Sequence, residues 1–281
     1  MRQIQHPGPP FPERVTAVPG APVPLRFSLE AGLSVDVAIA RGFAAAGCLG
    51  GYVVLRGGRC EPFRFVMPAA SPDDAHAAWY SDTFAPEGSV RIERAGAIVG
   101  ERDGRFFIHC HGLWETPEGR RMGHMLAPDT VVTEPVEAVG IGFRDATFMA
   151  APDPETHFTL FGPVSRVQGG EEPVGPRVLL ARVRPNEDIG TAIESLCGRW
   201  GIARANVHGI GSLNGVRFAD GRRVEAHATE VLIHEGRTGP DGVMRIDVVD
   251  MDGHIHSGPI VEGDNPVCVT FELLIEEIPG P

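Results

Sequence analysis

The sequence predicts an α+β fold made of two tandem copies of one module, and three observations support this. Residues 24–58 and 177–218 follow one plan, in which a short apolar strand and a polar stretch precede a helix and a β-rich run. Segments 121–143 and 255–277 match each other in the same way near the end of each half. The 36 glycines and 25 prolines favour short elements joined by turns. Each copy would span roughly 110–150 residues, a normal domain size.

An apolar face at helical spacing marks the helix of each copy. In the second copy this face consists of Ile189, Ile193, Leu196 and Trp200, and in the first it consists of Val35, Ile39 and Phe43. Asn186, followed by two acidic residues, is the predicted cap of the second helix. One helix is therefore expected in each module.

The module boundaries follow from composition and from one insertion. We expect a first module over residues 1–160, a linker over 161–175 and a second, degenerate module over 176–281. The first copy carries an insertion at 60–89 with its own aromatic residues. Long ordered segments of this kind often form lids or subunit contacts. The insertion is therefore expected to fold over a neighbouring part of the chain.

Composition restricts the classes of partner and compartment. The formal net charge is −12 and no basic cluster stands out, so nucleic acid is not expected as a partner. The five cysteines show no C-x-x-C spacing, which favours free thiols in a reducing, cytoplasmic compartment. The N-terminus lacks the apolar core of a signal peptide, and no apolar stretch has the length of a membrane span, so no membrane partner is expected.

Several motifs of the second half resemble a known family. They are "GIGSLNGVRF", "EVLIHEG" and "GDNPVCVTFELLI". Together with the strand and helix before them, they are similar to the plants-and-prokaryotes conserved domain, also called PPC or DUF296. The resemblance covers nearly all of 176–277, and in the first copy it covers the helix and 106–143, with the insertion as the main departure.

The resemblance implies a mostly antiparallel sheet with a helix packed against it in each module. It also implies a homo-oligomer, with a trimer favoured. In plants the domain follows AT-hooks and accompanies DNA binding, but this sequence has no Arg-Gly-Arg-Pro hook.

Three histidines of the first copy are predicted to converge. The segment "RFFIHCH" alternates as a strand does, which puts His109 and His111 on one face. The stretch "TPEG" at 116–119 has the residues of a β-turn, and a turn there places His111 opposite His124. Directly opposed Cβ atoms are only about 4.5–5.5 Å apart. A bulge in this hairpin would shift the register and separate the rings.

Three imidazoles on one patch of sheet are the ligand count of a catalytic zinc site with one open position. Zn2+ is the expected ion because imidazole suits it, and another divalent metal is the alternative. Some prokaryotic members of the resembled family carry histidines at these strand positions, which implies metal binding. Glu115 and Glu137 are candidate bases on metal-bound water by sequence proximity alone, and each also fits a solvated surface charge.

The second copy breaks this pattern. Pro259 stands where His124 would be, and His254 and His256 form their own H-x-H pair nearer the turn. We favour a degenerate copy that keeps the fold without the site. The alternative is that this second pair approaches the first copy's histidines across a domain interface.

Three functions remain open from the sequence. The first is a metal-binding protein, possibly an enzyme, that hydrolyses or hydrates a small molecule. The second is the DNA-binding or regulatory role that the resemblance implies. The third is a structural module in which the histidines stabilise an assembly.

Overall fold

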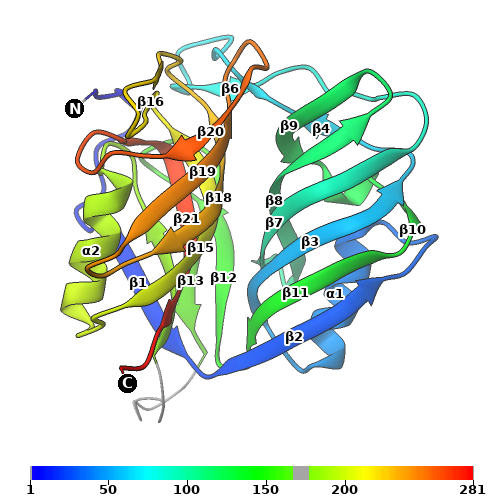
Figure 1. The fold of residues 1–281 in the computed structure, drawn as a ribbon, viewed down its shortest axis with the longest axis horizontal. Coiled ribbons are helices and arrows are strands. Elements are labelled where there is room, and N and C mark those ends of the chain that lie inside the picture. The colour runs from blue at the N-terminus through cyan, green and yellow to red at the C-terminus, as the bar shows by residue number, and fades with distance from the viewer. Residues whose placement is uncertain (1, 167–176, 281) are drawn as a thin grey trace.

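Strands dominate the computed structural model, which describes residues 2–166 and 177–280. Two large, mostly antiparallel sheets stand face to face, and each is accompanied by one helix (Figure 1). The fold is thus predominantly β, with less helix than the expected α+β class implies. One helix per copy is confirmed.

The first sheet comes from the first half of the chain. Its strands are β2 (Pro22–Leu29), β3 (Gly50–Cys60), β4 (Phe65–Val66), β7 (Val90–Arg102), β8 (Arg105–Thr116), β9 (Gly119–Met125), β10 (Val132–Glu134), β11 (Val136–Phe143), β12 (Ala146–Pro152) and β13 (Thr159–Ser165). The main path runs β2-β11-β3-β7-β8-β9-β4, and β10, β12 and β13 pair at its margins. Helix α1 (Val35–Ala45) lies between β2 and β3 in the chain, and a 3-10 turn, η1 (Ala127–Asp129), precedes β10.

The second sheet runs β1-β14-β21-β15-β18-β19-β20. Its strands are β1 (Val15–Gly20), β14 (Val178–Val183), β15 (Ala205–Leu213), β18 (Glu230–Arg237), β19 (Val243–Val249), β20 (Ile255–Pro259) and β21 (Val267–Glu277). Helix α2 (Ile189–Arg199) follows β14, and β16 (Val216–Arg217) pairs with β17 (Arg223–Val224). Strand β1 comes from the N-terminal segment yet pairs with β14, so the first module donates a strand to the second sheet.

The two sheets share one topology, which is the structural sign of duplication. In the first sheet β2, β3, β7, β8, β9 and β11 follow one another in the chain, and in the second β14, β15, β18, β19, β20 and β21 do so. In both sheets the spatial order is the first, sixth, second, third, fourth and fifth of these strands. The closing strand of each copy therefore inserts between its first two strands.

Each helix buries one face, as its spacing predicts. The buried residues are Val35, Ala38, Ile39 and Phe43 in α1, and Ile189, Ala192, Ile193, Leu196 and Cys197 in α2. The predicted cap is wrong by two residues, because Asp188 caps α2 by accepting a hydrogen bond of 2.8 Å from the Thr191 amide. Asn186 instead has a left-handed backbone, with φ of 65°.

An apolar layer joins the two sheets. It contains Tyr52, Ile98, Leu113 and Met122 of the first copy, and Leu180, Ile210, Leu232 and Leu274 of the second. These side chains are almost fully buried, so the copies form one continuous body. Side chains of both copies can therefore contribute to one site at this joint.

The insertion closes over one end of the joint. Strand β4 extends the first sheet beside β9, and β5 (Pro68–Ala69) pairs with β6 (Trp79–Tyr80). Figure 1 shows β6 at the top, above the space between the sheets. Only the start of the expected linker at 161–175 is described, where β13 ends, and residues 167–175 lie outside the described residues. In the described part of the chain, no helix is long and apolar enough to span a membrane.

Candidate functional site

The β8–β9 hairpin brings the three histidines together. Its turn lies at Pro117 and Glu118, and His111 pairs directly with His124, so the predicted register is confirmed. The ring centroids are 4.6 Å apart for His109 and His111, 4.9 Å for His109 and His124, and 5.3 Å for His111 and His124. One nitrogen of each ring lies within 4.8 Å of a nitrogen of the other two.

The second copy fixes the orientation of two of these rings. Nδ1 of His109 lies 3.0 Å from Oε2 of Glu272, and Nδ1 of His111 lies 3.0 Å from the carbonyl oxygen of Val231. Both oxygens are acceptors, so each Nδ1 carries the proton and donates it. Each Nε2 then carries a lone pair if its ring is neutral, or the second ring proton if its ring is positively charged.

These two Nε2 atoms face each other at 2.9 Å. Oε2 of Glu230 also lies 2.9 Å from Nε2 of His111. Nε2 of His111 therefore lies between two electron-rich atoms, and such a buried group requires a cation, either a proton or a metal ion. Burial lowers the pKa of His111, but the charge and hydrogen bond of Glu230 outweigh it, and the net shift is upward.

His124 completes the cluster as a neutral ring. Its Nδ1 is buried without a hydrogen-bond partner among the described residues. Burial, together with the neighbouring His109 and His111, holds its pKa well below the ordinary value. The Tyr80 ring of the insertion packs edge-on against it, with centroids 5.3 Å apart. A neutral imidazole with an unmet nitrogen beside two other rings suits a metal ligand.

Two buried glutamates of the second copy were missed by sequence reasoning. Glu230 begins β18, and Glu272 lies in the middle of the apolar strand β21 with 1% of its surface exposed. Burial raises the pKa of Glu272, but His109, Arg182 and the Thr270 hydroxyl outweigh this effect and lower it. The available signal was a carboxylate inside the apolar run "CVTFELLI", because an acidic residue is rarely buried without a partner.

The predicted carboxylates lie elsewhere. Glu115 is largely exposed and forms an ion pair with Arg91, and Glu137 forms one with Arg26. Neither lines the cavities beside the histidines, one of about 50 Å³ and one of about 230 Å³. The geometry therefore provides no role for either residue at the cluster.

The second H-x-H pair forms a separate group. His254 and His256 both approach Asp250, at 3.4 Å and 3.0 Å. Among the described residues, the groups with metal-ligating geometry are the three histidines and a distinct set of Asp250, Asp252 and His254. The reading in which the second pair joins the first copy's histidines is not supported.

Comparison with known families finds one match, in the second half of the chain. Residues 170–279 match the Plants and Prokaryotes Conserved (PCC) domain. A plant- and prokaryote-conserved (PPC) protein of Pyrococcus horikoshii is 14% identical with a TM-score of 0.41, and the match covers 53% of this chain and 96% of that one. No curated protein matches.

Two further solved structures are similar at the same level. A putative DNA-binding protein of Bacteroides thetaiotaomicron is 14% identical with a TM-score of 0.38, and the match covers 49% of this chain and 90% of that one. A metal-containing protein of Archaeoglobus fulgidus is 15% identical with a TM-score of 0.38, covering 57% and 99%.

These comparisons correct the leading functional expectation. A metal-dependent hydrolase or hydratase finds no support, because the family model that matches residues 170–279 is that of the PCC domain. The geometry gives a physical reason, since the carboxylates nearest the histidines are buried partners of the rings and the expected bases lie elsewhere.

The family match is thus confined to the second half of the chain. Residues 170–279 are similar to the Plants and Prokaryotes Conserved (PCC) domain, and the first half repeats the strand order of that region.

Proposed function

We propose that this chain is a PCC protein of the DNA-binding or regulatory class, and that a divalent cation at the histidine cluster fastens its two copies together. The observation that carries the second part is that Nε2 of His111 lies 2.9 Å both from Nε2 of His109 and from Oε2 of Glu230, a residue of the second copy. The cation has a structural role in this proposal.

The donor set fits zinc first, with another divalent metal as the alternative. His109, His111 and His124 would supply three ligands, and Glu230, which contacts Nε2 of His111, would take the fourth position of a structural zinc site. Two nitrogens of a tetrahedral zinc site are about 3.3 Å apart, close to the 2.9 Å between the Nε2 atoms. Glu272 and the Val231 carbonyl would orient the rings from the far side, as outer partners of metal-bound histidines do.

The ligands come from both copies, and this determines what the cation would do. The histidines belong to β8 and β9, and Glu230 and Glu272 belong to β18 and β21 of the other sheet. An ion that binds only the joined arrangement stabilises that arrangement. The occupancy of the site would therefore regulate how firmly the two sheets hold together.

DNA is the partner class to test first, because two of the similar structures are described as putative DNA-binding proteins. The sequence contains no lysine, so apart from the histidines its positive side-chain charge is on arginine, and the formal net charge with neutral histidines is −12. Sequence-independent attraction to phosphates is then weak. We expect binding at low salt that falls off with a shallow slope.

Metal content tests the cation. Protein purified without added metal should contain about one equivalent by elemental analysis. His111→Ala and His124→Ala should lose it, whereas His227→Ala, at an exposed histidine outside the cluster, should keep it. Equal metal content in the unmodified protein and the three variants would overturn the proposal that a cation binds at the histidine cluster.

DNA binding is tested separately. Fluorescence anisotropy of a labelled mixed-sequence duplex should rise with protein at about 20 mM salt and fall by 200 mM. The titration is repeated after chelation to ask whether the cation matters. No binding at low salt in either form would refute the DNA assignment and leave the metal result standing.

Assembly stays a prediction. We propose a homo-oligomer, with a trimer favoured by the family resemblance. Sedimentation equilibrium should give a mass of about three chains of 30.1 kDa, and a monomer at high concentration would contradict it.

A further inference from the structure

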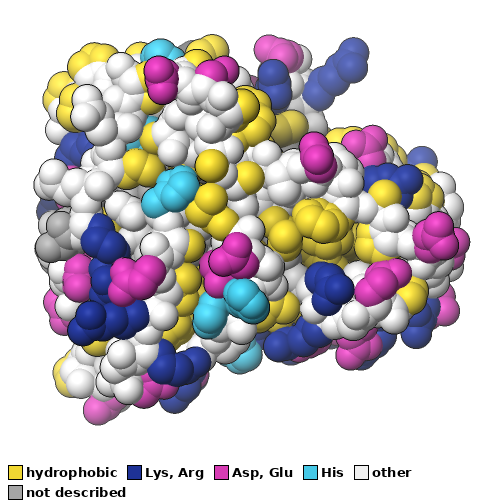
Figure 2. All heavy atoms as spheres, turned by 90° about the horizontal axis from the view of Figure 1, so that it is seen from above, with side chains coloured by type: hydrophobic (Ala, Val, Ile, Leu, Met, Phe, Trp, Pro, Cys, Tyr) yellow, Lys and Arg dark blue, Asp and Glu magenta, His cyan; other side chains and the backbone are white. Residues whose placement is uncertain are grey.

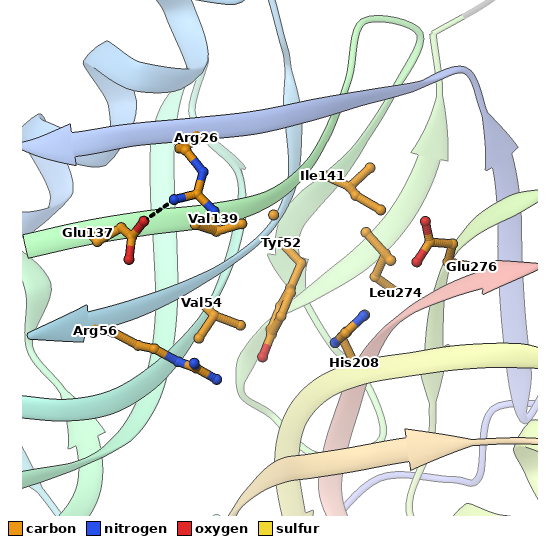
Figure 3. Close-up of a pocket in the computed structure, with 11 residues that line it drawn as sticks. Arg26, Tyr52, Val54, Arg56, Glu137, Val139, Ile141, His208, Leu274 and Glu276 are labelled. Carbon is orange, nitrogen blue, oxygen red and sulfur yellow. Dashed lines mark hydrogen bonds and ion pairs between the residues drawn. The ribbon is translucent and has the colours of Figure 1, made fainter. Parts of the chain in front are cut away.

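A third cavity, of about 440 Å³, lies between the two sheets. Its walls come from β2, β3 and β11 of the first copy and from β15 and β21 of the second (Figure 3). It shares no lining residue with the two cavities beside the histidines. Its volume falls in the range of small-molecule pockets, about 300–1,000 Å³.

The middle of this cleft is apolar because strand register aligns apolar residues across it. Val54 of β3 pairs with Val139 of β11, and the next residues on the same face, Tyr52 and Ile141, also pair. Leu274 faces them from the second copy (Figure 3). Val139 remains 36% exposed, so this lining is not fully covered within the chain.

One wall also carries stacked rings. Tyr52 and His208 lie with centroids 5.5 Å apart and planes tilted by 23°. Burial lowers the pKa of His208, so this ring is neutral at pH 7 and adds no charge to the cleft. A flat apolar group could therefore pack against this wall without removing water from a charged side chain.

The charged residues stand around the apolar middle and are unevenly paired (Figure 3). Arg26 is held by Glu137, and Glu276 accepts a hydrogen bond of 3.2 Å from the Asn206 amide. The Arg56 side chain forms neither a hydrogen bond nor an ion pair with another residue in 2–166 or 177–280. The cleft thus offers an unpaired guanidinium at one side of an apolar surface.

We propose that this cleft binds a small carboxylate with an apolar body. The carboxylate would lie on the Arg56 guanidinium, which can donate two parallel hydrogen bonds to it. The body would cover Val54, Val139 and Leu274. This proposal is independent of the cation and of DNA binding.

The probe is 1-naphthoate, with 1-naphthalenemethanol as its uncharged counterpart, and binding is measured by calorimetry at pH 7. Naphthoate should bind in a saturable way, and Arg56→Gln should weaken it about tenfold, the value of one charged contact. The alcohol should bind more weakly than naphthoate and be insensitive to Arg56→Gln. Arg41→Gln, which removes a charge from helix α1, should leave the affinity for both ligands unchanged.

A second variant tests the apolar wall at an exposed position, where the fold tolerates change. Val139→Asp places a carboxylate opposite the bound one and should abolish naphthoate binding while leaving the melting temperature unchanged. No saturable binding by the unmodified protein overturns the proposal. Naphthoate binding that is unchanged in both variants would also overturn it. A change from oligomer to monomer in Val139→Asp would overturn it too, because this cleft would then be a subunit interface.

Discussion

Nε2 of His109 and Nε2 of His111 lie 2.9 Å apart, while the opposite nitrogen of each ring faces an oxygen that only accepts hydrogen bonds. Two neutral imidazoles in this arrangement would direct lone pairs at each other. The oxygens come from strands β21 and β18, more than a hundred residues away in the chain. The joint between the two copies is thus what gives the histidines their common direction.

Glu272→Gln should lower metal affinity about 10- to 100-fold, because an amide is a weaker partner than a carboxylate for the Nδ1–H of His109. The measurement is competition with a fluorescent zinc chelator. Glu277→Gln, further along the same strand, is the matched control and should leave affinity unchanged. Equal affinities of the two variants would mean that Glu272 does not orient a ligand.

Tyr80→Ala should accelerate metal loss without changing metal content. The Tyr80 ring packs against His124 and lines both cavities beside the cluster, so its removal opens a path for water and chelator. Stopped-flow mixing with excess chelator gives the rate. Trp79→Ala, the neighbouring residue whose ring stacks on Phe158, should have a smaller effect. If Tyr80→Ala releases metal no faster than the unmodified protein, the insertion does not act as a cover.

Asp153→Asn should destabilise the fold at neutral pH by about 3–5 kcal/mol, because it removes the carboxylate that two buried arginines share and leaves Arg184 only the more distant Glu155, at 3.9 Å. Asp153 contacts Arg182 at 2.9 Å and Arg184 at 2.7 Å, and these cations hold the pKa of the Asp153 carboxyl well below its ordinary value, despite burial. A lowered folded-state pKa gives stability that is present above the unfolded value of about 3.9 and is lost as pH falls below it.

The difference in unfolding free energy between Asp153→Asn and the unmodified protein should therefore be constant from pH 7 to about pH 5 and shrink below about pH 4. Urea unfolding at several pH values measures it. Asp103→Asn, an exposed carboxylate, should cause no measurable change at any pH. A difference that persists unchanged in acid would show that charge pairing is not its source.

Two helix glycines should respond to alanine with opposite signs. A Cβ on Gly42 of α1 would meet the Phe27 ring at 2.3 Å, so Gly42→Ala should destabilise by about 1–3 kcal/mol through overpacking. A Cβ on Gly198 of α2 would meet nothing within 4 Å, so Gly198→Ala should stabilise by up to about 1 kcal/mol. Thermal unfolding of both variants tests this, and stabilisation by both would contradict the packing of α1.

The local parts of this molecule could be predicted from the sequence. Alternation and one turn were enough to place His111 opposite His124, and helical spacing identified both buried helix faces. These features depend on contacts within a hairpin or a single helix. The duplication was also visible, because both copies preserve the same succession of apolar and polar segments.

The partners of the histidines could not be predicted in the same way. Glu230 and Glu272 reach the cluster only because the sheets pack face to face, and no local pattern states which faces meet. Proximity in sequence suggested Glu115 and Glu137 instead, which both pair with arginines away from the cluster. The strand that β1 contributes to the second sheet was missed for the same reason.

X-ray absorption at the zinc edge tests the cation site most directly, using protein loaded with one equivalent of zinc. We expect a first shell of four nitrogen or oxygen atoms, with the outer-shell scattering of three imidazole rings, and no such shell in His111→Ala, which should not retain the ion. A shell dominated by water, with one imidazole or none, would contradict a cation held between the two copies.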